Sequence, residues 1–216
     1  MNHEYEKIWE LAKPYLTKGR WWDLWHTELS IGYMEDILEG EGMLELENKL
    51  MPAIILHDIG WSQLGEEKNY AWHSKENRIL HMKEGAKIAK RILLKTHYKI
   101  DLIERIVYLV GTHDKEYLRE SPVSLDEKFL RDADSCFIFS EVSFWKDYHL
   151  QGSDYTPQSF LEILLEKYSK KYTEAASIIV KENVKKRKKE IRDTSIDPEE
   201  RYYNLKKAAK KRTLDD

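Results

Sequence analysis

Two side chains of metal-ligand type stand side by side at the end of an apolar run, at His57 and Asp58. Neighbouring side chains on a helix point about 100° apart, so these two can share one metal only at an end or a bend of the element. Gly60 supplies a place for that bend. A buried carboxylate beside an imidazole is costly unless a charge compensates it, and a divalent cation would do so. Taken alone, the pair favours a simpler interpretation, in which His57 caps one helix and Asp58 caps the segment that follows.

Further histidines and aspartates lie in or at the ends of other apolar segments of the chain. They are His26, His81, His113, Asp114 and Asp134. Each alone has an ordinary explanation, because a single helical histidine is more often a core or surface residue than a ligand. Several helices that each present an imidazole or a carboxylate beside an apolar stripe are, however, the way a metal site is built in a helical bundle. Together these residues predict a metal centre between helices.

The elements that must position these residues all have helical spacing, and strand-like alternation is not sustained anywhere in the sequence. The expected helices cover about residues 4–16, 21–39, 44–56, 75–94, 101–113, 124–137, one long helix over 157–192 and a last short helix from 197, with a loop over 60–70. The expected starts are a Ser74 cap, capping boxes at Asp101/Glu104 and Ser124/Glu127, and Thr156-Pro157. We therefore predict an all-α fold, with a helical core over residues 1–155. Residues 156–216 would form a helical extension that packs on the core or projects from it.

The composition narrows the possible partners. The 216-residue chain has a net charge of −3, so it lacks the global basic field that is typical of nucleic-acid binders. A lysine-rich stretch from Lys181 onward is interleaved with acids and is interpreted as a solvated helix face rather than a nucleic-acid surface. Cys136 is the single cysteine, which excludes an intrachain disulfide and favours a reducing compartment. The absence of an apolar signal core or a membrane-length run leads us to expect a cytoplasmic protein without membrane contact.

The order His26, then His57-Asp58, then Asp134 resembles the H…HD…D signature of the HD superfamily of metal-dependent hydrolases. The resemblance covers roughly residues 20–140. It implies an all-α HD-domain bundle with the metal held between helices. It also implies that His26, His57, Asp58 and Asp134 are the ligands of a first metal ion. Asp132 is a competing ligand, but Asp134 stands in the register of the family.

The segments around His81 and His113 resemble the extra histidine positions of two-metal HD proteins, including diadenosine tetraphosphate hydrolases and HD-GYP phosphodiesterases. By this resemblance, His81 and His113 hold a second metal and Asp58 bridges the two. The chain departs from the HD-GYP pattern at Thr112 and Trp61, and no GYP motif follows, so a cyclic dinucleotide phosphodiesterase is not expected. The glutamate that mononuclear 5′-nucleotidases of the family carry just after the doublet is also missing.

Mixed imidazole and carboxylate ligands suit one or two ions of Mn, Fe, Co, Ni or Zn, which can activate a water and stabilise charge on a phosphate. Asp58 and Asp114 are the candidate catalytic carboxylates, and Asp114 would orient His113 or accept a proton. Substrate phosphate and base are expected to meet residues near the ligand segments. The candidates are Arg20, Arg78, Lys115 and Trp61.

These expectations lead to one main functional hypothesis and two alternatives. The main hypothesis is a phosphohydrolase for a small phosphate ester, with a nucleotide as the expected substrate and a homo-oligomer as a possible state. The first alternative is a diiron oxygenase, because the same six ligands resemble those of myo-inositol oxygenase. The second is a metal-bound regulatory module whose basic C-terminal helix meets a partner.

Overall fold

The computed structural model describes residues 3–65, 71, 73–115, 120–152, 154–193, 195 and 197–212. The described part of the chain consists of helices and their connections and contains no β-strand, so the all-α prediction is confirmed. The helices of the first half are α1 His3–Lys18, α2 Asp23–Gly40, η1 Leu44–Leu46, α3 Glu47–Leu56, η2 Ile59–Gln63, α5 Lys75–Lys95, α6 Ile100–Val110 and α7 Leu125–Cys136. Those that follow are η4 Phe137–Phe139, α8 Glu141–Asp147, the π-helix η5 Tyr148–Gly152, α9 Pro157–Tyr168, α10 Glu174–Arg192 and α11 Pro198–Arg212.

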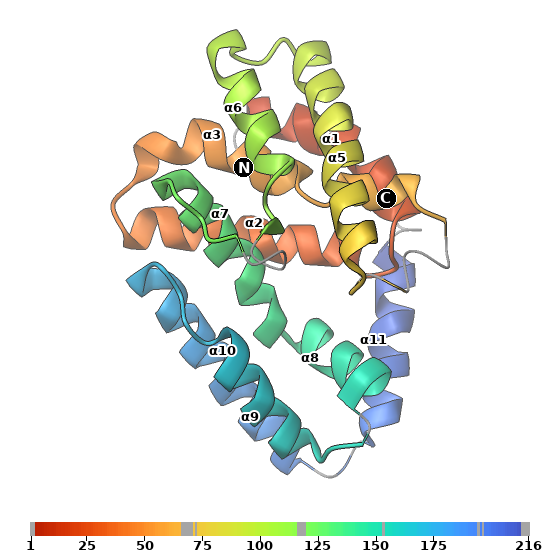
Figure 1. Cartoon of the computed structure of the whole chain (residues 1–216). Helices are drawn as coiled ribbons and strands as arrows, with labels where there is room; N and C mark the ends of the chain where they lie inside the picture. Colours follow the sequence, from red (N-terminus) through yellow and green to blue (C-terminus); the bar gives the residue numbers. More distant parts are fainter. Residues whose placement is uncertain are drawn as a thin grey trace.

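Helix α3 is the centre of the first half of the molecule. Every residue from Leu50 to Leu56 is buried, and α3 packs against α1, α2, α6 and α7 (Figure 1). A helix that is apolar on all sides is stable only when other elements surround it. The His57-Asp58 doublet at its C-terminal end is therefore delivered into the interior rather than to the surface.

Several predicted helix starts are confirmed. Ser74 accepts a hydrogen bond from the backbone of Asn77 at the start of α5, and Ser124 and Glu127 form the expected capping box at α7. The predicted box at Asp101 is wrong, because α6 already begins at Ile100 and has no side-chain cap. The predicted loop over residues 60–70 is wrong in its first part, where η2 continues to residue 63, and residues 66–70 lie outside the described part of the chain.

The single long helix predicted over residues 157–192 is wrong, because α9 and α10 are separate helices. The chain between them is held by Asp132 of α7, which accepts hydrogen bonds from the backbone N–H groups of Tyr172 and Thr173 and from the Thr173 hydroxyl. Thr173 in turn caps α10 by accepting a bond from the Ala176 N–H. These contacts replace the helical bonds that the break removes, and they give Asp132 a structural role away from the metal-type ligands.

The C-terminal helices pack on the rest of the molecule. The Asn183 amide of α10 donates to the Tyr33 hydroxyl of α2 at 3.1 Å, and the Trp145 indole of α8 donates to Glu190 at 2.9 Å. In Figure 1, α8 to α11 lie together on one side of α2 and α7. Val180, Val184 and Arg187 of α10 are buried, whereas its lysines are exposed to solvent.

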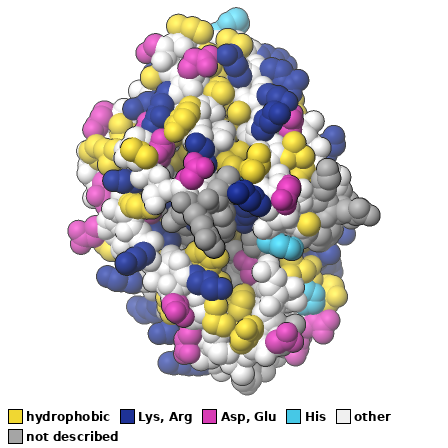
Figure 2. All heavy atoms as spheres, in the orientation of Figure 1, with side chains coloured by type: hydrophobic (Ala, Val, Ile, Leu, Met, Phe, Trp, Pro, Cys, Tyr) yellow, Lys and Arg dark blue, Asp and Glu magenta, His cyan; other side chains and the backbone are white. Residues whose placement is uncertain are grey.

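Charged side chains of both signs cover the surface. Figure 2 shows lysine and arginine side chains spread over the face in view, with acidic side chains among them. Among the described helices, none combines the length and the apolar character that a membrane crossing requires.

Candidate metal centre

The local structure at the end of α3 turns His57 and Asp58 toward one point. His57 still has helical backbone angles, whereas Asp58 leaves the helix with φ −101° and ψ 3°. The bend therefore falls on Asp58 and not on Gly60 as expected from the sequence. Gly60 serves a different purpose, because a Cβ atom there would lie 1.9 Å from the carbonyl oxygen of His81. The absence of a side chain allows η2 to touch the backbone of α5.

The first group of candidate ligands comes from α2, the end of α3 and α7. The Nε2 atoms of His26 and His57 are 2.8 Å apart. Asp134 Oδ1 lies 3.1 Å from His26 Nε2 and 3.7 Å from His57 Nε2. Asp58 Oδ2 completes the group at 3.9 Å and 3.7 Å from the same two nitrogens. Four side chains that are separated by up to 108 positions in the sequence thus share one centre.

The second group comes from α5 and the end of α6, and it uses the other oxygen of Asp58. His81 Nε2 and His113 Nε2 lie 3.2 Å apart. Asp58 Oδ1 lies 3.5 Å from His81 Nε2 and 3.4 Å from His113 Nε2. Asp58 consequently presents one oxygen to each pair of histidines, and all five of these residues are buried.

The hydrogen bonds of the imidazoles show that these residues fit a cation. His57 Nδ1 lies 2.7 Å from the Ile54 carbonyl, and His113 Nδ1 lies 2.8 Å from the Val110 carbonyl. A longer contact of 3.3 Å joins His81 Nδ1 to the backbone carbonyl of Asn77. Because a carbonyl can only accept, each Nδ1 carries the proton, and the lone pair of a neutral ring is on Nε2. The three Nε2 atoms point into the two groups, which is the arrangement of metal-binding histidines.

The electrostatics of the two groups favour negative carboxylates and a compensating positive charge. Burial alone raises the pKa of Asp58, but His57 and Arg20 outweigh it and hold this pKa well below its usual range. Burial lowers the pKa of His81 to about 3, so that ring is neutral. Burial also disfavours the charged form of His113, but the contact with Asp58 outweighs it and raises the pKa to about 9. Arg20 already pairs with Asp58 Oδ2, and a proton on His113 or a divalent ion can add positive charge beside Oδ1.

Asp114 joins the second group but not in the way the sequence suggested. It accepts a 2.6 Å bond from Arg78 and lies 3.4 Å from His81 Nε2. The expected role in orienting His113 is filled by the Val110 carbonyl. Burial raises the pKa of Asp114, but Arg78 and His113 more than offset this, so the carboxylate is ionised near neutral pH.

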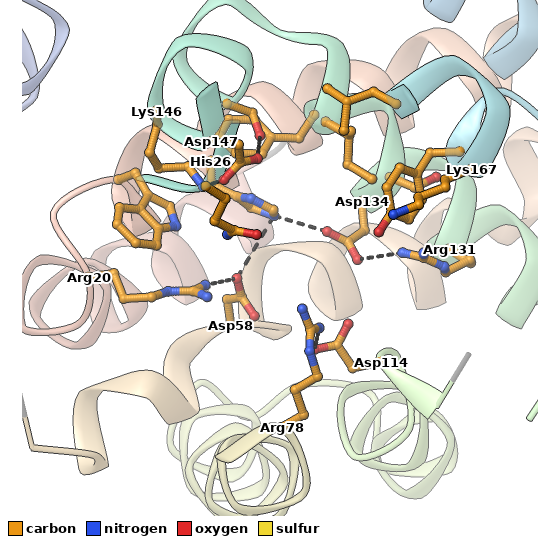
Figure 3. A pocket seen from close by; sticks show the side chains of 18 of the residues that line it. Arg20, His26, Asp58, Arg78, Asp114, Arg131, Asp134, Lys146, Asp147 and Lys167 are labelled. Atoms are coloured by element: carbon orange, nitrogen blue, oxygen red, sulfur yellow. Dashed lines mark hydrogen bonds and ion pairs between the residues drawn. The ribbon is translucent and has the colours of Figure 1, made fainter. Parts of the chain in front are cut away.

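A cavity opens onto the ligand groups through His26, Asp58 and Asp134 (Figure 3). Three of the four predicted substrate residues, Arg20, Arg78 and Trp61, line it. The Arg20 guanidinium donates to Asp58 Oδ2 at 2.7 Å, and the Trp61 indole donates to Asp58 Oδ1 at 3.0 Å. Lys115 is placed elsewhere, because it lines a neighbouring cavity and pairs with Glu120 at 3.6 Å.

Three cations of this cavity were missed by sequence reasoning: Arg131, Lys146 and Lys167. Arg131 lies 3.3 Å from Asp134, and its position three residues before Asp134, on the same helix face, is a signal that could have found it. Lys146 and Lys167 carry no such signal, because α8 and α9 reach the cavity only through the folding of the C-terminal half.

Comparison with known proteins identifies the class. The family model described as HD domain matches residues 25–137, which is more than half of the chain. The chain belongs to the HD domain family, as the sequence predicted. No curated protein and no solved structure matched it.

Proposed function

We propose that this protein is a metal-dependent phosphohydrolase that acts on a small phosphate ester, with a nucleotide as the expected substrate. The observation that carries the proposal is the position of Asp58, which lines a cavity rich in cations and whose two oxygens face two separate pairs of histidines. Buried carboxylates and neutral imidazoles suit divalent ions, and arginines and lysines around them suit phosphate oxygens.

The ligands divide between two ions. His26, His57 and Asp134 would hold the first, His81 and His113 the second, and Asp58 would contribute to both. When bound, such ions supply an activated water and stabilise charge on the phosphate.

The remaining residues of the site bind the phosphate, orient a ligand side chain or accept a proton. Arg20 and Arg78 each lie against a carboxylate at the edge of the ligand groups, where they can turn toward phosphate oxygens. Trp61 stacks on His81 with ring centroids 4.2 Å apart and so fixes this ring. Asp114 is ionised and lies beside the second group, so it can accept the proton of the attacking water.

Five cations line the cavity and suit an anionic substrate, which counts against a diiron oxygenase for a polyol but not against one for a phosphonate. A division into an HD core of residues 1–155 and an extension of residues 156–216 is also part of the proposal. Its support is that the family match, residues 25–137, lies wholly within this core.

The experiment is a phosphate-release assay over a panel of phosphoesters with added Mn, Co, Ni, Zn or Fe. We expect metal-dependent release that His81→Ala reduces at least tenfold, because removal of a metal partner typically costs at least this much. His97→Asn, an exposed substitution in the turn between α5 and α6, is the matched control and should keep full activity. Absence of release with every metal would refute the hydrolase, and iron-dependent oxygen uptake would support the alternative.

A further inference from the structure

The cavity has a second wall that lies outside the HD domain match. The structure describes 21 residues that line the cavity. Nine of them come after residue 138 and belong to α8, η5 and α9. They are Ser143, Lys146, Asp147, Gln151, Phe160, Ile163, Leu164, Lys167 and Tyr168. The HD segment thus supplies the metal-type ligands, and a molecule that fills the cavity would also contact a surface outside that segment.

The α9 part of this wall is an apolar strip. Phe160, Leu164 and Tyr168 follow each other at intervals of four residues, and Ile163 lies beside them, so all four occupy one face of the helix. Phe160 and Leu164 are buried, whereas Ile163 and Tyr168 are half-buried. The exposed part of such a strip gains free energy when an apolar part of a ligand covers it.

Lys167 lies at the end of the strip, one helical turn after Ile163, and its side chain is exposed. Figure 3 shows it on the side of the cavity that holds Arg131 and Asp134. The other four cations of the cavity each contact a carboxylate. Within the described ranges, Lys167 has no ion pair. Its charge is therefore available to an anionic group of a ligand.

We propose that α9 selects the substrate and that the preferred class is a nucleotide with two separate phosphate groups. The planar base would pack on the apolar strip, mainly on its half-buried residues Ile163 and Tyr168, and the second phosphate would meet Lys167. This inference rests on the proposed function only for the position of the reacting phosphate, which lies at the ligand groups. A sugar phosphate would leave the strip uncovered, and a nucleoside monophosphate would leave Lys167 without an anion.

Three ligands of increasing complexity test this assignment on the full-length protein: ribose 5-phosphate, adenosine 5′-monophosphate and adenosine 3′,5′-bisphosphate. Where the protein hydrolyses the ester, the readout is KM and kcat. Where it does not, the readout is the Kd from tryptophan fluorescence, since Trp22 and Trp61 line the cavity. We expect the affinity to rise in the order given.

Two variants separate the two contacts. Ile163→Asn should weaken the binding of both nucleotides roughly fivefold and leave the binding of ribose 5-phosphate unchanged, because only the base contacts the strip. Lys167→Ala should weaken the binding of the bisphosphate alone, by roughly threefold to fivefold, as expected for the loss of a partly exposed ion pair. The matched controls are Ile178→Asn, an exposed position on α10, and Lys170→Ala, just beyond α9, and both should bind like the wild type.

These measurements separate a failure of the α9 inference from a failure of the proposed hydrolase function. Equal affinity for all three ligands, or a loss at Lys167→Ala that is the same for the mono- and bisphosphate, would overturn the inference even if the protein is a phosphohydrolase. The expected order of Kd without any phosphate release would support the inference and count against hydrolysis. Because Lys167 is exposed, its substitution leaves the fold intact, and thermal melting verifies this.

Discussion

Gly60→Ala is the substitution that tests most directly how the fold brings the two ligand groups together. The added Cβ would lie 1.9 Å from the carbonyl oxygen of His81 and 2.6 Å from the backbone N of Gly85. Both atoms belong to the backbone of α5, so no side chain can move aside to relieve the clash. The helix η2 and the helix α5 must separate instead.

The size of the displacement follows from these distances. A non-bonded carbon contact is comfortable at about 3.5 Å, so the two backbones must move apart by roughly 1.5 Å. Overpacking a core costs about 1–3 kcal/mol and sometimes more, and a backbone contact with no flexible partner places Gly60→Ala near about 3 kcal/mol. For a chain of this length that is a fall in Tm of about 6–12 °C.

The same displacement separates His81 from Asp58. Their contact of 3.5 Å between Nε2 and Oδ1 belongs to the second ligand group, and metal sites tolerate errors of only about 0.2 Å. We therefore expect the Gly60→Ala variant to bind metal less tightly at the second ligand group and to keep the metal of the first group.

The assay combines thermal melting with metal analysis of protein purified without chelator. Gly32→Ala is the matched control, because a Cβ there meets no atom within 4 Å in the middle of α2. It should be stabilised by about 0.5–1 kcal/mol through the lower entropy of its unfolded chain. If Gly60→Ala melts like the wild type and keeps the same metal content, the close approach of η2 to α5 is not what positions His81.

Three further predictions follow from the charges and burial of single groups. Asp58→Ala should abolish binding at both ligand groups in the same metal analysis, because each group uses one of its oxygens; retention of one ion would contradict the shared role. Burial tends to raise the pKa of Asp126, but its bond from Arg105 outweighs this and lowers the pKa to about 2. Since the folded pKa lies below the unfolded value of about 3.9, the pair stabilises the fold above pH 4 and the contribution is lost as the pH falls toward 2. Arg105→Ala should accordingly lower the unfolding free energy by about 1 kcal/mol at pH 6, after allowance for solvent screening, and by much less at pH 2 in urea titrations. Burial raises the pKa of the Cys136 thiol to about 12, so thiol reagents at pH 8 should modify it only after unfolding; rapid labelling of the native protein would contradict this.

Local sequence patterns were enough to predict the helical character of the chain and to single out the histidines and aspartates that the fold brings together. Helical periodicity and caps such as Ser124 with Glu127 act over a few residues, so they are readable from a short window of sequence. The His57-Asp58 doublet at the end of an apolar run is also a local feature, although alone it favoured a capping role. The order of histidines and aspartates along the chain pointed to the HD domain family by its resemblance to that family's signature.

Which partners these residues meet depends on the packing of helices that are far apart in the sequence. The break between α9 and α10 depends on Asp132, 40 positions before Tyr172, and local spacing alone predicted an unbroken helix. The division of the Asp58 oxygens between two histidine pairs, and the placement of Lys115 in another cavity, likewise depend on how separate helices pack. The approach of α9 to the metal-type ligands also depends on this packing. Side-chain contacts between distant segments are set by the summed packing of the whole chain, and no window of sequence contains that information.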